Sequence, residues 1–356
     1  MRILHILRKF NGGGVEAVVM NYYKHIDRDK YQFDFVCCEN SHFIPEKEIN
    51  ELGGKVYKVT SITNIFKYIS EIKNIAKGYD IVHCHMGPIA FPALIGCMLA
   101  GCKIRILHSH TETKKNQPVK LVFNNVCKQI SKRLATYRLA CSRNAGDWLY
   151  GNMDYIVLNN AIDTDKYKFS KTNRKKNRKE LGVNDNEILI GHVGRFQAQK
   201  NHPFLIDVFN DVVKQEPNYK LLLIGDGNDK DEIVKKVDSL NINNNVVFLG
   251  QIGDVEKYYS AMDVFTLPSL CEGLPVVGVE AQANGLKCFF SDNVSQEALL
   301  SNTAKMLPLD KDVWKNELLK CYPLTFHYVN KIKDFDIKEK AKDLEKIYER
   351  LVWYQK

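Results

Sequence analysis

Two glutamates with seven residues between them could bind the hydroxyl groups of a substrate. Glu272 follows the apolar run 263–268, which predicts a buried strand, and Glu280 lies where apolar residues recur at helical spacing. The turn between them and the start of that helix comprise Gly273, Leu274, Pro275 and Val276. Unpartnered N–H groups and the dipole at a helix N-terminus attract anions. The stretch indicates a phosphate site between two carboxylates, with an ordinary strand–turn–helix carrying surface glutamates as the alternative.

Two cations follow the first strand of the second half of the chain. Arg195 and Lys200 lie just after the apolar run 187–193, and Asn201 could cap the helix that we expect from Pro203. Two cations at this position could bind a diphosphate. The alternative is a solvent-exposed pair of little consequence, which the neighbouring glutamate pattern makes less favoured.

Two pairs of histidines lie where predicted strands of the first half end. His83 with His85, and His108 with His110, each lie at positions i and i+2, on one face of a strand. No acidic or cysteine partner nearby completes a metal site, so the sequence does not favour one. For the second pair the sequence favours a histidine that bonds to a sugar hydroxyl or acts near the reaction centre. For the first pair, a histidine that caps the strand end is comparably favoured.

The turn Asn11–Gly14 contains Gly13 and Gly14, which would let a substrate approach the backbone before the next helix. The turn does not match the dinucleotide pattern G-x-G-x-x-G, because Val18 and Val19 follow where a third glycine is needed. A simple tight turn is an equally good interpretation.

Strands and helices alternate along the whole chain, which predicts an α/β fold with two doubly wound parallel sheets. Apolar runs predict strands at 3–7, 33–38, 55–59, 81–85, 104–108, 138–141 and 155–158, and then at 187–196, 219–224, 246–249, 264–267 and 287–290. We expect a first domain over 1–165, a second over 166–335, and a final helix within 336–356 that packs back on the first. The polar stretch 159–179 is expected to be a linker and a solvated helix start.

Composition limits the classes of protein that remain. The chain has 356 residues, 45% of them hydrophobic, and a net charge of +9, which suits phosphate-bearing substrates or acidic lipid. No aromatic-rich basic module is present, so nucleic acid is not an expected partner. No apolar run reaches the length of a membrane span, and the N-terminus lacks a signal-peptide pattern. The ten cysteines lie mostly in apolar runs without metal spacing, which favours a reducing cytoplasm and no metal.

Taken together, the motifs resemble those of the retaining glycosyltransferases of family 4, which have the GT-B fold of two Rossmann-like domains facing a cleft. The resemblance rests on Gly13–Glu16, His108–Thr111, Gly194–Asn201 and Pro268–Ala281, and it extends over nearly the whole chain. The segment Leu107–His110 is most similar to capsular and exopolysaccharide enzymes.

The resemblance implies a role for each matching residue. Arg195 and Lys200 would hold the donor diphosphate, Glu280 the ribose, Glu272 the transferred sugar, and the backbone of 273–276 the phosphates or that sugar. Gly13 and Gly14 would belong to the loop that approaches donor phosphate and acceptor. His110 matches the active-site histidine because Thr111 follows it, and His108 is the competing choice.

The resemblance also implies the reaction: transfer of a hexose, with retention and without a metal or other cofactor, from a nucleotide-sugar. UDP-sugar is the favoured donor, and a lipid-linked or polysaccharide acceptor is expected, at the cytoplasmic face of the membrane with peripheral contact to anionic lipid. No Asp-x-Asp motif falls in a suitable turn, in keeping with a metal-independent reaction. The alternatives are a nucleotide-sugar epimerase of the same fold and a non-catalytic scaffold that binds nucleotide-sugar.

Overall fold

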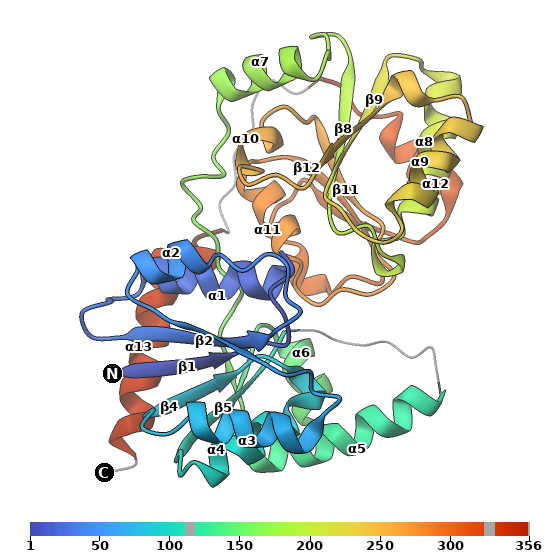
Figure 1. Ribbon diagram of the computed structural model, residues 1–356. Coiled ribbons are helices and arrows are strands. Elements are labelled where there is room, and N and C mark those ends of the chain that lie inside the picture. Colours follow the sequence, from blue (N-terminus) through green and yellow to red (C-terminus); the bar gives the residue numbers. More distant parts are fainter. Residues whose placement is uncertain (111–117, 324–331, 355–356) are drawn as a thin grey trace. The chain divides into compact units, whose positions relative to one another are not determined.

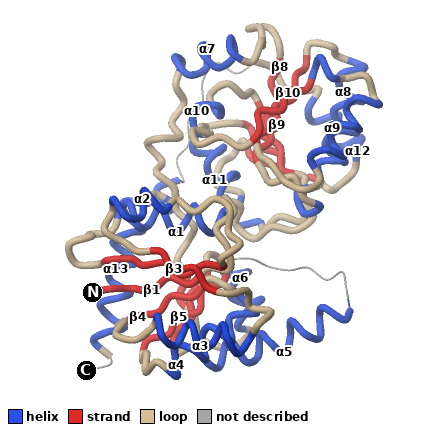
Figure 2. Tube along the Cα trace, in the orientation of Figure 1, coloured by secondary structure: helices blue, strands red, loops and turns tan. Residues whose placement is uncertain are grey.

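The structure is a computed structural model that describes residues 1–110, 118–323 and 332–354. For residues 118–121 it describes the backbone alone. The chain divides into two compact units (Figure 1). The first contains Met1–Ile162 and Phe335–Lys356, and the second contains Asp163–Asp334. Each unit has its own parallel sheet, with helices along the outside of the strands (Figure 2). This confirms the predicted fold class of two Rossmann-like domains.

The sheet of the first unit has seven parallel strands in the order β3-β2-β1-β4-β5-β6-β7. These strands are β1 (Arg2–Ile6), β2 (Gln32–Cys38), β3 (Val56–Val59), β4 (Ile81–Cys84), β5 (Ile104–Ser109), β6 (Tyr137–Ala140) and β7 (Ile156–Val157). The helices are α1 (Gly14–His25), α2 (Glu46–Glu51), α3 (Ile65–Ile75), α4 (Phe91–Leu99), α5 (Pro118–Leu134), α6 (Arg143–Tyr150) and α13 (Ile337–Trp353). The strand order reverses between β1 and β4, the position at which such sheets bind ligands.

The sheet of the second unit has six parallel strands in the order β10-β9-β8-β11-β12-β13. These strands are β8 (Ile188–Val193), β9 (Tyr219–Ile224), β10 (Val246–Gly250), β11 (Val264–Leu267), β12 (Lys287–Ser291) and β13 (Ala304–Leu307). The helices are α7 (Lys171–Glu180), α8 (His202–Gln215), α9 (Lys230–Ser239), α10 (Glu256–Tyr259), α11 (Val276–Ala283) and α12 (Lys311–Leu318). Here the order reverses between β8 and β11, so the loops after these two strands are adjacent.

Burial explains why these segments become strands. The middle of β9 consists of three leucines with no exposed surface, as expected for a strand covered by helices on both faces. The helices bury one apolar stripe each. In α8 this stripe contains Leu205, Phe209 and Val212, which pack in one hydrophobic core with two of the leucines of β9. The fully buried Trp314 of α12 completes this core from an element that the sequence pattern did not predict.

The basic run at 171–179 is not simply a solvated helix start, because two of its arginines are structural. It forms α7, and Arg174 and Arg178 both reach the buried carboxylate of Asp263, at 2.6 and 2.9 Å. Their side chains are 15% and 2% exposed. The two arginines lie at positions i and i+4, on one face of the helix, and the other charged residues face solvent.

The final helix, α13, packs against α1 in the first unit. Glu345 accepts a hydrogen bond from the Asp27 N–H (2.8 Å), and Glu349 accepts one from the Tyr31 hydroxyl (2.9 Å). Leu344 and Tyr348 of α13 are buried beneath these contacts. Within the described residues, every helix is too short or too polar to cross a lipid bilayer.

Candidate functional site

Hydrogen bonds join the two stretches of the second unit that the sequence singled out. The loop after β8 contains a short 3₁₀ turn (Ala198–Lys200) followed by Asn201 in the left-handed conformation, with φ of 57°. The Gln199 carbonyl accepts from Leu270 N–H (2.8 Å), the Gln199 amide donates to the Cys271 carbonyl (2.7 Å), and the Asn201 amide donates to the Pro268 carbonyl (3.2 Å). Segments about seventy residues apart in sequence therefore form one surface at the ends of β8 and β11.

Lys200 and Glu272 meet on this surface in an ion pair of 2.7 Å, with only 13% and 14% of their side chains exposed. Arg195 lies on the same loop as Lys200 and is exposed. Among the described residues, the guanidinium of Arg195 makes no hydrogen bond or ion pair. The lysine charge is thus partly compensated by the glutamate, whereas that of Arg195 is available to a ligand.

The start of α11 leaves backbone donors open beside Glu272. Pro275 is the N-cap and offers no side-chain hydrogen bond. Among the described residues, the N–H groups of Gly273, Val276 and Val277 have no acceptor, as expected of the first turn of a helix. Open donors of this kind are what an anion site needs, and the anion site itself stays a prediction.

Glu280 lies inside α11, and the residue is 7% exposed. Its two oxygens accept hydrogen bonds from the hydroxyls of Tyr167 (2.8 Å) and Tyr259 (2.6 Å). Burial raises the pKa of Glu280, and the two tyrosine hydrogen bonds oppose that rise. Its partners in the structure are therefore tyrosines, whereas Glu272 is paired with a cation.

A glycine after β9 holds the Arg195 loop in place. A Cβ at Gly227 would lie 2.2 Å from the Phe196 carbonyl oxygen, so no other residue fits there without a shift of the backbone. Phe196 N–H donates to the Asp226 carbonyl (3.0 Å), and the Phe196 carbonyl accepts from Asp229 N–H (3.2 Å). The close approach of these two loops fixes the backbone from which Arg195 projects.

In the first unit, Gly13 is the N-cap of α1 and Gly14 is its first residue. The Glu16 carboxylate turns back over this helix start and accepts a hydrogen bond from Asn11 N–H (3.2 Å). A Cβ at Gly13 would lie 2.5 Å from a Glu16 carboxylate oxygen, so a larger residue there would displace this side chain from the helix start. The glycine turn is thus ordered around an acidic side chain.

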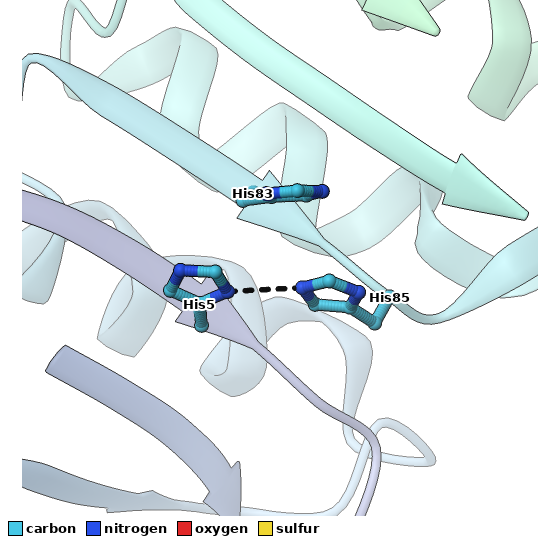
Figure 3. A group of neighbouring side chains, drawn as sticks. All are labelled: His5, His83 and His85. Carbon is cyan, nitrogen blue, oxygen red and sulfur yellow. Dashed lines mark hydrogen bonds between the residues drawn. The ribbon is translucent and has the colours of Figure 1, made fainter. Parts of the chain in front are cut away.

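Five histidines gather at the ends of β1, β4 and β5. The structure joins the two predicted pairs, because His83 Nε2 lies 3.1 Å from His108 Nδ1 and His85 Nδ1 lies 2.8 Å from His110 Nε2. His5 of β1 completes the cluster through a 3.0 Å contact with His85 (Figure 3). Together the rings line a small cavity. The residue after His110, Thr111, lies outside the described residues.

The sequence interpretation missed His5. The signal that could have identified it is the strand order, since a doubly wound sheet places the first strand beside the fourth. In the structure His5 and His83 are direct partners in the β1–β4 register. A histidine in the first strand should therefore have been read together with those that end later strands.

The cluster contains two groups with ring nitrogens close enough to bind one metal ion: His5, His83 and His85, and His85, His108 and His110. Figure 3 shows His5 and His85 edge to edge, with a nitrogen of each directed at the other, and His83 to one side. A tetrahedral zinc ion needs lone pairs that converge at about 2.0–2.1 Å. Because the nitrogens point at one another, the rings would have to turn before they could ligate a metal.

Burial keeps these rings neutral. It lowers the pKa of His5 to about 3 and that of His110 to about 4, and it lowers the pKa values of His83, His85 and His108 well below the usual 6.5. A neutral ring has one N–H donor and one acceptor nitrogen, so contacts between rings depend on where each proton lies.

We expect the stability of the first unit to fall as the pH falls. Unfolded histidines bind protons near pH 6.5, whereas folded His5 does so only near pH 3, so unfolding takes up protons between these values. The free energy of unfolding should fall by about 1.4 kcal/mol per pH unit for each such ring. Urea titrations between pH 7.5 and 4.5, followed by the fluorescence of Trp148 and Trp353, measure this slope. His5→Leu should reduce this slope by the contribution of one histidine. An unchanged slope would contradict the lowered pKa of His5.

Comparison with known proteins identifies the family. Residues 12–166 match the model of the family described as Glycosyltransferase Family 4, and residues 173–304 match that of Glycosyl transferases group 1. The chain is 33% identical over 312 residues to the putative glycosyltransferase EpsF of Bacillus subtilis, with 83% of this chain and 80% of that protein covered. The chain belongs to the group 1 glycosyltransferases.

Further relatives of this glycosyltransferase carry more specific names. It is 24% identical over 322 residues to the Escherichia coli UDP-Gal:alpha-D-GlcNAc-diphosphoundecaprenol alpha-1,3-galactosyltransferase, with 85% of this chain and 82% of that enzyme covered. The crystal structure of Anabaena HepE in complex with UDP-glucose is similar in fold, with a TM-score of 0.80 and 19% identity over 98% of this chain and all of that one. This similarity supports the GT-B fold of the enzyme.

Proposed function

We propose that the enzyme transfers a hexose or hexose derivative from a UDP-sugar, with retention of anomeric configuration, to a lipid-linked or polysaccharide acceptor. The observation that carries the proposal is the joined surface of the second unit. There an exposed arginine, a lysine–glutamate pair and the open N-terminus of α11 lie on adjacent loops. The second unit would bind the donor and the first the acceptor.

The chemistry follows from these charges. Breaking the bond between the anomeric carbon and oxygen leaves negative charge on the departing diphosphate. Arg195, Lys200 and the N–H groups of Gly273, Val276 and Val277 would stabilise that charge in fixed positions. Positive charge from these groups would take the place of a divalent ion, so we propose a metal-independent reaction.

The two glutamates would then have different roles. Glu272 would accept hydrogen bonds from hydroxyls of the transferred sugar, and its ion pair with Lys200 would hold it beside the diphosphate. A carboxylate offers about four lone-pair sites, and two of those on Glu280 are used by tyrosines. The remaining sites would suit the two ribose hydroxyls of the nucleotide.

The proposed acceptor rests on relatives and on one surface. The E. coli relative is named for a sugar on diphosphoundecaprenol, a membrane lipid, and a Staphylococcus aureus relative for capsular polysaccharide biosynthesis. In the first unit, α5 exposes one apolar stripe, with Val122, Phe123, Val126 and Ile130 between 38% and 67% exposed. The exposed Arg133 lies on the same face of the helix as Val122 and Val126. This helix suits peripheral contact with an anionic membrane better than α7 does.

Replacing Phe123 and Val126 together by glutamate should release the enzyme from anionic vesicles. Each substitution removes an apolar contact worth roughly 1.5–3 kcal/mol and adds a negative charge, so binding should weaken about tenfold or more. Co-sedimentation with vesicles containing phosphatidylglycerol measures this. The matched control is Phe66→Glu, because Phe66 of α3 is 86% exposed in the same unit. An equal loss of vesicle binding in both variants would show that α5 is not the membrane-contact surface.

The proposed reaction is tested by thermal-shift measurements with UDP- and GDP-sugars, followed by NMR of the product linkage. UDP-sugars should raise the melting temperature, and the new glycosidic bond should keep the anomeric configuration of the donor. Conversion of the sugar without an acceptor would indicate an epimerase. No stabilisation by any nucleotide would indicate a scaffold and overturn the proposal.

A further inference from the structure

Three histidines form a single chain of contacts that ends at His110. Asn160 Oδ1 lies 3.4 Å from His110 Nδ1, His110 Nε2 lies 2.8 Å from His85 Nδ1, and His85 Nε2 lies 3.0 Å from His5 Nδ1. Each ring thus presents a different nitrogen to each neighbour. Since every ring is neutral, the position of one proton determines the positions of all the others.

The two ends of this chain of histidines determine the direction in which its hydrogen bonds run. The amide oxygen of Asn160 can only accept, so His110 Nδ1 must carry a hydrogen. His110 Nε2 is then an acceptor and must receive a hydrogen from His85 Nδ1, and His85 Nε2 must receive one from His5 Nδ1. His5 Nε2 is left as a buried lone pair without a partner, next to the ring of Phe33 at 4.1 Å. The opposite direction would bury an unpartnered N–H there, which folded proteins rarely do.

We propose that His85 and His5 are positioning residues that hold His110 as the Nδ1–H tautomer. His110 then presents a hydrogen-bond donor, and not a base, at Nδ1. Its contact with Asn160 is long, and the His110 side chain is partly exposed, so an oxygen of a substrate could replace the amide as acceptor. The class of ligand atom is therefore a sugar hydroxyl, carbonyl or phosphate oxygen.

The histidine chain cannot conduct protons, because its inner end is closed. If all three rings changed tautomer, His110 Nδ1 would give up its proton and His5 Nε2 would have to take up another. His5 Nε2 is buried and has no hydrogen-bond partner that could supply that proton. The histidines consequently act as a fixed support that orients one N–H.

Long-range ¹H–¹⁵N NMR of the full-length, ¹⁵N-histidine-labelled enzyme at pH 7.5 tests the proposal. His110 should show a protonated Nδ1 and an unprotonated Nε2, the tautomer that a free neutral histidine disfavours. His85→Leu removes the donor to Nε2 and should shift His110 toward the Nε2–H form. His85→Asn should restore the Nδ1–H form, because an asparagine amide can donate from the same place. The matched control is His42→Asn, a histidine outside the cluster.

A protonated Nε2 on His110 in the unmodified enzyme would overturn the proposal, whatever its activity. So would an unchanged His110 tautomer in folded His85→Leu protein. The catalytic consequence rests on the proposed function and has a separate readout. Transfer should fall in His85→Leu and recover in His85→Asn. If the NMR result holds but His110→Phe transfers sugar at the normal rate, the role of His110 in transfer fails while the tautomer assignment stands.

Discussion

Arg195→Ala should lower kcat for sugar transfer by about 10²–10³-fold, the effect expected when one group that stabilises developing negative charge is removed. Lys200 is already paired with Glu272, so Arg195 supplies the uncompensated charge on this surface. Arg195→Lys should recover only part of the rate, because an ammonium lacks the planar, bidentate geometry of a guanidinium. Initial rates at saturating donor and acceptor measure the effect.

The control for charge alone is Arg350→Ala, which removes another exposed arginine, on α13 in the first unit. Its rate should equal that of the unmodified enzyme. Circular dichroism and melting temperature should be unchanged in both variants, since neither side chain packs in a core. Normal transfer by Arg195→Ala would place the diphosphate elsewhere.

Asp263→Asn should destabilise the second unit by about 3–5 kcal/mol, the cost of removing one charged partner from a buried ion pair. The carboxylate is fully buried and receives Arg174, Arg178 and the Leu189 N–H, the last at 2.7 Å. A neutral amide would leave the buried guanidinium of Arg178 and the largely buried one of Arg174 without an anion. Unfolding by urea, followed by the fluorescence of Trp314 in the core of this unit, measures the loss.

The matched control is Asp254→Asn, which breaks an ion pair with Lys257 of 2.7 Å in which both side chains are half exposed. Exposed pairs contribute little to stability, so this variant should unfold at nearly the same urea concentration as the unmodified enzyme. Equal effects of the two substitutions would show that the Asp263 cluster is not a structural centre.

The sequence predicted the elements whose residues repeat a simple pattern. Strands such as β9 and β11 are short apolar runs, and α8 and α13 carry an apolar stripe, so burial and periodicity alone identify them. The short helix α2 and the edge strand β13 have no such pattern, and were missed. The exposed and intermediate residues of β13 show why, since an edge strand is only partly covered.

The site was predicted as separate motifs, and its connections were not. Nothing near Lys200 in sequence indicates that it pairs with Glu272, because the adjacency of β8 and β11 comes from the strand order of the sheet. The tyrosine partners of Glu280 were likewise invisible, since Tyr167 precedes it by 113 residues. The histidine pairs were recognised, but not their union with His5, for the same reason.

The arginine contacts of α7 determine where the second unit can be cut from the chain. A recombinant fragment that starts at Leu181, just before β8, would contain every strand of the sheet but neither arginine partner of Asp263. Ser170 also belongs to the unit, because its side chain caps α7 and its N–H donates to the Ser260 hydroxyl at 3.1 Å. A fragment of the second unit intended for crystallisation or NMR should therefore begin before Ser170. Beginning at Asp163 would also keep Tyr167, the hydrogen-bond partner of Glu280.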